Sequence, residues 1–145
     1  MKARVPIVAG FFTEEGGQAR LLGGRCPRCG AWYFPKQWSF CRNPRCDGGP
    51  IDDAALSPRG RLWSWTDHRY APPPPYPGSE PFEPYGVGAV ELADEAMVVL
   101  GQLARGTDVG ALTLGQPMEL VVEALYEDDE AEHTVWKWRP EGATP

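Results

Sequence analysis

All four cysteines of this chain lie in one short stretch, CPRCGAWYFPKQWSFCRNPRC, residues 26–46. They form two pairs, Cys26 with Cys29 and Cys41 with Cys46, and eleven residues separate the pairs. Two such turns can close four thiolates around one tetrahedral ion, which is the arrangement of structural zinc sites. Four protein ligands leave no open position for water, so the pattern predicts a structural zinc and disfavours catalytic zinc or redox chemistry. A segment this short also needs such a clamp to fold.

The rest of the composition favours a β-rich globular protein. The chain has 16 Pro, 17 Gly and 42% hydrophobic residues, as expected for many short elements joined by turns. No run approaches the roughly 18 apolar residues of a membrane span, and MKARVPIVAGFF lacks the pattern of a secretory signal. We therefore expect a cytoplasmic protein without a membrane partner, where reduced cysteines bind metal more readily than they form disulfides.

Five runs of aliphatic, aromatic and β-branched residues follow the cysteines, each bounded by turn residues. In the fourth run, Met118, Leu120, Val122 and Ala124 occupy alternate positions, as in a strand with one buried face. We expect the second and third runs to form a hairpin, and residues 106–116 to form one helical turn and a turn at Gly115. The five predicted strands are GRLWSWTDHRY (60–70), YGVGAVELA (85–93), MVVLGQLAR (97–105), PMELVVEAL (117–125) and EHTVWKWR (132–139).

These elements predict a mainly β protein in which a rubredoxin-like zinc ribbon precedes a five-stranded barrel, with the OB-fold as the leading closed arrangement. The predicted units are a leader (1–24), the ribbon (25–50), the barrel (51–140) and a tail (141–145). The leader contains a possible short helix around GFFTEEGGQARLL, weakened by Gly16 and Gly17. Phe11 and Phe12 would form an apolar patch if exposed, so they pack either on this domain or on a partner.

Charge is distributed unevenly along the chain. Eight basic and three acidic residues give residues 1–50 a net charge of +5, and six basic and seventeen acidic residues give residues 51–145 a net charge of −11. The basic residues around the cysteines either offset the charge of a four-thiolate centre or meet phosphate. An OB-fold suggests binding of single-stranded nucleic acid, and Trp63 and Trp65 on one strand face could stack bases. The acidic barrel would repel a phosphate backbone, which disfavours nucleic acid as a partner.

The order of several blocks resembles one known family. GRCPRCGAWYFPKQWSFC, GRLWSWTDHRY, PYGVGAVELAD and LTLGQPMELVV resemble the successive blocks of the acyl-CoA-associated zinc-ribbon and OB-fold proteins, long described as a domain of unknown function. The resemblance covers roughly residues 11–139. It implies that the four cysteines bind zinc, and that the chain accompanies a thiolase-superfamily enzyme or a hydratase. It is nearest to members that pair with a lipid-transfer-protein-type thiolase homologue and cleave steroid side-chain acyl-CoA esters by retro-aldol chemistry.

The resemblance thus implies a non-catalytic accessory subunit that stabilises a thiolase-like dimer in a hetero-oligomer and borders the channel for the CoA ester. Accessory subunits of an acyl-CoA thiolase or an enoyl-CoA hydratase remain alternatives, as do a nucleic-acid-binding OB protein and a stand-alone acyl-CoA carrier. The sequence itself contains no serine elbow and no paired carboxylates at an interpretable spacing, and Asp67 and His68 point to opposite strand faces. We assign no catalytic residue to this chain.

Aromatic residues are the candidates for contact with a partner or with the substrate channel. The proline-rich segment APPPPYPGSEPFEP covers residues 71–84. It is a rigid loop that presents aromatic side chains, a proline-rich recognition motif or an inert connector. The acidic run EDDEAE (127–132) is a solvated hairpin loop or a second partner-facing surface. The candidate residues are Phe11, Phe12, Trp32, Tyr33, Phe34, Trp38, Trp63, Trp65, His68, Tyr76 and Phe82.

Overall fold

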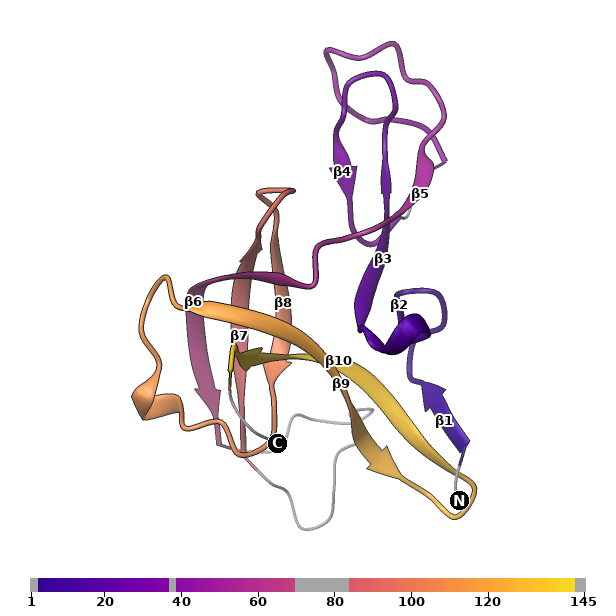
Figure 1. The fold of residues 1–145 in the computed structure, drawn as a ribbon. Coiled ribbons are helices and arrows are strands. Elements are labelled where there is room, and N and C mark those ends of the chain that lie inside the picture. Colours follow the sequence, from indigo (N-terminus) through magenta and orange to yellow (C-terminus); the bar gives the residue numbers. More distant parts are fainter. Residues whose placement is uncertain (1–2, 37–38, 70–83, 143–145) are drawn as a thin grey trace.

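The computed structural model describes residues 3–36, 39–69 and 84–142 (Figure 1). Predictions for Trp38, Tyr76, Phe82 and most of the proline-rich segment lie outside these residues. The N-terminal part contains β1 (Ala3–Pro6), β2 (Phe12–Thr13), the 3-10 helix η1 (Glu15–Gly17), β3 (Arg20–Arg25), β4 (Trp32–Tyr33) and β5 (Asp52–Ala55). The C-terminal part contains β6 (Arg59–His68), β7 (Tyr85–Leu92), β8 (Val98–Leu103), the 3-10 helix η2 (Val109–Ala111), β9 (Pro117–Glu127) and β10 (Ala131–Pro140).

Strands β6 to β10 close into a barrel. Antiparallel pairing joins β6 with β7, β7 with β8, β6 with β9, and β9 with β10. A short parallel pairing of β8 with β10, at Gln102 and Leu103 opposite Lys137 and Trp138, completes the circle. The five predicted runs match these strands to within two residues at each end, and the predicted hairpin is the β7–β8 pair. The predicted five-stranded OB-fold barrel is therefore confirmed.

Two tryptophans of β10 donate hydrogen bonds to the part of β8 that does not pair with β10. The indole N–H of Trp136 donates to the Leu100 carbonyl at 3.0 Å, and that of Trp138 donates to the Val99 carbonyl at 3.2 Å. A Cβ atom on Gly101 would lie 3.0 Å from both indole rings, so glycine is needed there for the two side chains to fit. Trp138 is fully buried in the barrel core together with residues from β6 to β9, namely Leu62, Val90, Leu92, Val99, Leu103, Met118 and Leu120.

A β-bulge in β6 separates two residues that the sequence placed together. The pairing of β6 with β7 shifts register between Leu62 and Ser64, which leaves Trp63 as the extra residue. A bulge of this kind changes the alternation of side chains along a strand. Trp63 is 63% exposed, whereas Trp65 packs against the core. The prediction that these two tryptophans share one face is therefore wrong.

The leader forms extended structure and one tight turn instead of a regular helix. Gly16 and Gly17 have φ angles of 75° and 79°, which lie in the left-handed region and end any right-handed helix. The helical part is limited to η1, and β3 begins three residues later. β3 pairs with β2, β4 and β5, so it runs across the predicted boundary at residues 24 and 25 and ties the leader into the ribbon. Figure 1 shows β3, β4 and β5 extending away from the barrel.

Four aromatic side chains join the ribbon and the leader to the barrel, and we call Phe11, Phe12, Phe34 and Trp136 the aromatic junction. The ring of Trp136 lies 6.3 Å from Phe11, 6.0 Å from Phe12 and 5.7 Å from Phe34, measured between centroids. Phe11 and Phe34 also meet edge to face at 5.8 Å. Such aromatic pairs stabilise a contact beyond the area they bury. The junction is an apolar contact between the barrel and the N-terminal part of the chain.

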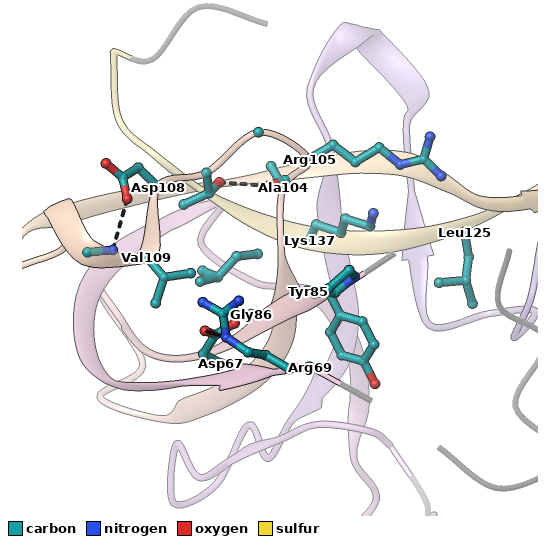
Figure 2. A pocket seen from close by; sticks show the side chains of 15 residues that line it. Asp67, Arg69, Tyr85, Gly86, Ala104, Arg105, Asp108, Val109, Leu125 and Lys137 are labelled. Carbon is teal, nitrogen blue, oxygen red and sulfur yellow. Dashed lines mark hydrogen bonds and ion pairs between the residues drawn. The ribbon is translucent and has the colours of Figure 1, made fainter. Parts of the chain in front are cut away.

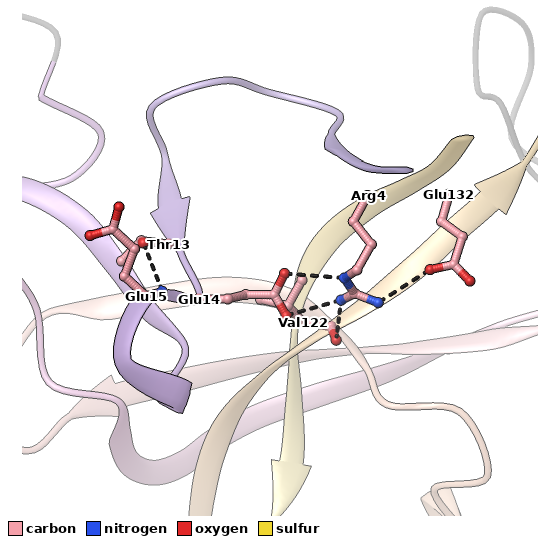
Figure 3. A network of polar contacts seen from close by, with 6 residues as sticks. All are labelled: Arg4, Thr13, Glu14, Glu15, Val122 and Glu132. Carbon is pink, nitrogen blue, oxygen red and sulfur yellow. Dashed lines mark hydrogen bonds and ion pairs between the residues drawn. The ribbon is translucent and has the colours of Figure 1, made fainter. Parts of the chain in front are cut away.

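A polar network around Arg4 fixes the first strand on the outside of the barrel (Figure 3). β1 lies parallel to β10 and pairs with residues 131–134. The Arg4 guanidinium contacts Glu14 at 3.0 Å, Glu132 at 3.2 Å and the Val122 carbonyl at 3.4 Å. These contacts connect β1, the turn before η1, β9 and β10 through one side chain.

Candidate metal centre and barrel cavity

The four cysteines meet at the far end of the ribbon. Their sulfur atoms all lie within 4.8 Å of one another. The sulfurs of Cys26 and Cys46 are 3.7 Å apart, and those of Cys29 and Cys41 are 3.6 Å apart. A tetrahedral zinc with Zn–S bonds of about 2.3 Å has sulfur–sulfur distances of about 3.8 Å. The residues present therefore fit one zinc ion, and all four positions of that ion would be occupied by protein.

Each cysteine pair is positioned by its own turn. In the first turn, the Gly30 N–H donates to the Cys26 carbonyl at 2.8 Å, and Gly30 has a φ of 79°, which favours glycine. In the second turn, the Asn43 side chain accepts from the Arg45 N–H at 3.0 Å, and the Asn43 carbonyl accepts from the Cys46 N–H at 3.0 Å. Asn43 thus stabilises the longer second turn, between Cys41 and Cys46, through its side chain and its carbonyl.

Backbone donors favour the thiolate form of the first cysteine pair, Cys26 and Cys29. The Ala31 N–H lowers the pKa of the Cys29 thiol to about 6, and the Cys29 N–H lowers the pKa of Cys26. Three of the five nearby basic residues are engaged within the chain: Arg28 pairs with Asp47 at 3.5 Å, Lys36 pairs with Asp53 at 2.6 Å, and the Arg25 guanidinium lies 4.6 Å from the Trp32 ring. These three side chains already have partners within the chain. Part of the positive charge that was expected to offset the thiolates or to bind phosphate is therefore paired locally.

A cavity of about 430 Å³ lies at the end of the barrel where β6 ends and β7 begins (Figure 2). Its wall includes Tyr85, Leu125 and the loop 104–110, with basic side chains from three separate elements. Lys137 is only 4% exposed, and its Nζ lies 3.2 Å from Glu123. Arg69 pairs with Asp67 at 2.8 Å, and Arg105 holds Glu123 through its backbone N–H at 3.1 Å. The cavity therefore combines a deeply buried ammonium group with charges nearer the surface.

The sequence alone did not indicate this cavity. Lys137 lies between Trp136 and Trp138, so strand alternation places it on the face opposite two apolar residues, where lysine is usually solvated. Its burial depends on β9, which supplies Glu123, and on the loop after β8. No local pattern in the sequence signals such a contact.

Comparison with known proteins assigns the family. Residues 13–52 match the family model described as the ChsH2 rubredoxin-like zinc ribbon domain, and residues 53–123 match the one described as the ChsH2 C-terminal OB-fold domain. The chain belongs to the ChsH2 family. A chain of the solved structure described as the "Ltp2-ChsH2(DUF35) aldolase" is 26% identical, with a TM-score of 0.62. The match covers 83% of this chain and 84% of that chain. The resemblance drawn from the sequence is confirmed.

Most candidate aromatics of the ChsH2 ribbon pack within the chain. Phe12 is 6% exposed because β2 and β3 turn it into the core, which matches the alternative that the leader phenylalanines pack on their own domain. Phe11 and Phe34 are half-buried in the aromatic junction, so Phe11 matches the same alternative, and contact of either residue with a partner stays a prediction. Trp32 is half-buried next to Arg25, and the Tyr33 hydroxyl lies beside Cys41, whose sulfur raises the pKa of the phenol.

Candidates on the ChsH2 OB domain stay predictions as contact residues. Trp63 presents a large apolar surface to solvent, and Trp65 packs partly against the core. His68 is the last residue of β6, next to the proline-rich segment in the sequence. Within the described residues, no helix has the length and apolar character needed to cross a membrane.

Proposed function

We propose that this chain is the non-catalytic accessory subunit of a two-protein aldolase, docked on a thiolase-like catalytic subunit. The observation that carries the proposal is the likeness to a chain of the Ltp2-ChsH2(DUF35) aldolase over 83% of this chain, together with both ChsH2 domains in the same order. A likeness that spans the ribbon and the barrel supports a shared role better than a match to either domain alone. The catalytic groups would then belong to the partner.

In this proposal the metal centre acts as a clamp. Cys26, Cys29, Cys41 and Cys46 would hold one zinc, which gives the ribbon a fixed shape without taking part in the reaction, since four thiolates fill the coordination sphere. The leader and ribbon would hold the partner, and the barrel edge beside residues 71–84 would border the substrate channel. We propose a steroid side-chain acyl-CoA ester as the substrate and retro-aldol cleavage as the reaction.

The basic side chains of the cavity support the proposed substrate class. Arg69, Arg105 and Lys137 line the cavity together with Asp67 and Asp108, and Arg69 and Pro84 of its wall flank residues 70–83 in the sequence. Cationic side chains of this kind bind phosphate oxygens through charge-assisted hydrogen bonds. We propose that the outer part of this cavity, near Arg69 and Arg105, faces the phosphate groups of the CoA ester in the complex.

Co-expression with a thiolase-like protein from the same host tests the proposal. The tagged chain should retain that protein through size-exclusion chromatography and increase its soluble yield, and the complex should cleave a CoA ester. Cys41→Ser should abolish retention, because the ribbon would lose its clamp, whereas Val98→Ser on the outer face of β8 serves as a matched control. Retention of an acyl-CoA thiolase or an enoyl-CoA hydratase instead would reassign the partner. A chain that binds no such enzyme would contradict the proposal.

A further inference from the structure

A tyrosine hydroxyl lies against one sulfur of the metal centre. The Oη atom of Tyr33 is 3.2 Å from the Sγ atom of Cys41. The same Oη accepts a hydrogen bond from the Arg42 N–H at 2.8 Å. The Asn43 N–H also points at the Cys41 sulfur, at 3.4 Å. Cys41 is therefore contacted by one side-chain hydroxyl and one backbone donor, on top of any metal it binds.

The direction of the Tyr33 hydrogen bond follows from counting protons. A phenol has one hydrogen to donate, and its oxygen already accepts from Arg42. A cysteine that ligates zinc is a thiolate, which has no hydrogen and can only accept. With zinc bound, the hydrogen bond between these two atoms therefore runs from the Tyr33 hydroxyl to the Cys41 sulfur.

We propose that Tyr33 is an outer-shell positioning residue of the zinc ribbon, which donates its hydroxyl hydrogen to the Cys41 thiolate. The bond spreads negative charge from a buried sulfur and fixes the orientation of that ligand. It also connects the metal centre to the rest of the chain. Tyr33 lies on β4 opposite Gly24, and its neighbour Phe34 belongs to the aromatic junction. Two adjacent residues thus link the zinc to the barrel, whichever partner the chain binds.

Cobalt substitution provides a readout that depends on the sulfur itself. In full-length protein loaded with Co²⁺, the sulfur-to-cobalt charge-transfer band reports the electron density on the thiolates. Tyr33→Phe removes the donor and should move this band to lower energy. 3-Fluorotyrosine at position 33 keeps the hydroxyl, has a more acidic phenol and should move the band to higher energy. Tyr126→Phe makes the same change on β9, where the ring stacks on His133, and should leave the band unchanged.

Zinc affinity gives the second measurement. Tyr33→Phe should weaken zinc binding by about 10–100-fold in competition with a chromophoric chelator, as for other outer-shell partners. Tyr126→Phe should stay within about twofold of the unsubstituted chain. A shift of the fluorotyrosine band to higher energy would support the proposal even if Tyr33→Phe folds poorly, because the fluorotyrosine variant keeps the native contacts. Unchanged bands in both variants, or a zinc affinity that Tyr33→Phe leaves intact, would overturn it.

Discussion

Replacing Phe34 by alanine tests whether the aromatic junction holds the ribbon on the barrel. Phe34 meets Phe11 at 5.8 Å and Trp136 at 5.7 Å between ring centroids, both edge to face. Removing a fully buried phenylalanine costs about 3–5 kcal/mol, and edge-to-face pairs contribute about 0.5–1.5 kcal/mol. Because Phe34 is half-buried, we expect Phe34→Ala to lower the free energy of unfolding by about 2 kcal/mol.

The assay is urea unfolding of the zinc-loaded chain, followed by tryptophan fluorescence and by circular dichroism. A loss of this size lowers the Tm of a domain of this length by about 4–8 °C. Phe40→Ala is the matched control, since Phe40 also lies near the cysteines but is 58% exposed, and its removal should cost less than about 0.5 kcal/mol. A double-mutant cycle with Trp136→Ala should give a coupling of about 0.5–1.5 kcal/mol. Equal stability of Phe34→Ala and Phe40→Ala would refute the reasoning.

Three further substitutions test the polar contacts. Arg4→Met should lower the free energy of unfolding by at most about 1 kcal/mol, because Arg4 and Glu14 are exposed, and about 1 M NaCl should remove most of the effect. Hydrogen bonds hold the pKa of Asp128 at about 2, so its ionised form stabilises the fold. Asp128→Asn should therefore be less stable than the unsubstituted chain above about pH 4. This difference in stability should vanish as the pH falls through 2. Lys137→Met should cost about 2 kcal/mol in urea unfolding by leaving Glu123 without its cation, and adding Glu123→Gln should recover most of it. The Arg4 assignment would be contradicted if salt did not change the loss of stability in Arg4→Met. The Asp128 assignment would be contradicted if the loss in Asp128→Asn did not depend on pH. The Lys137 assignment would be contradicted if Glu123→Gln did not restore the stability lost in Lys137→Met.

The features that the sequence predicted correctly are those set by local chemistry. Turn residues and β-branched runs determine where strands begin and end, so the five barrel strands could be placed to within two residues. The spacing of the cysteines and the turn residues between them are equally local features. The four sulfurs meet as predicted. Even the turn at Gly115, with a φ of 81°, could be recognised from glycine alone.

The features that the sequence did not predict depend on pairing between distant strands. One extra residue at Trp63 changes which face each later side chain of β6 occupies, and only the register with β7 reveals it. Lys137 is buried because β9 places Glu123 beside it. Each case depends on an element far away in the sequence.

A rate titration tests the proposed accessory role most directly. Cleavage of a steroid side-chain acyl-CoA ester by a fixed amount of the thiolase-like partner would be measured as this chain is added. The account predicts that the rate rises and saturates at a fixed ratio of the two proteins, and that the Cys41→Ser chain produces no rise. A partner that is fully active without this chain, or a rate that does not change when the chain is added, would contradict the account.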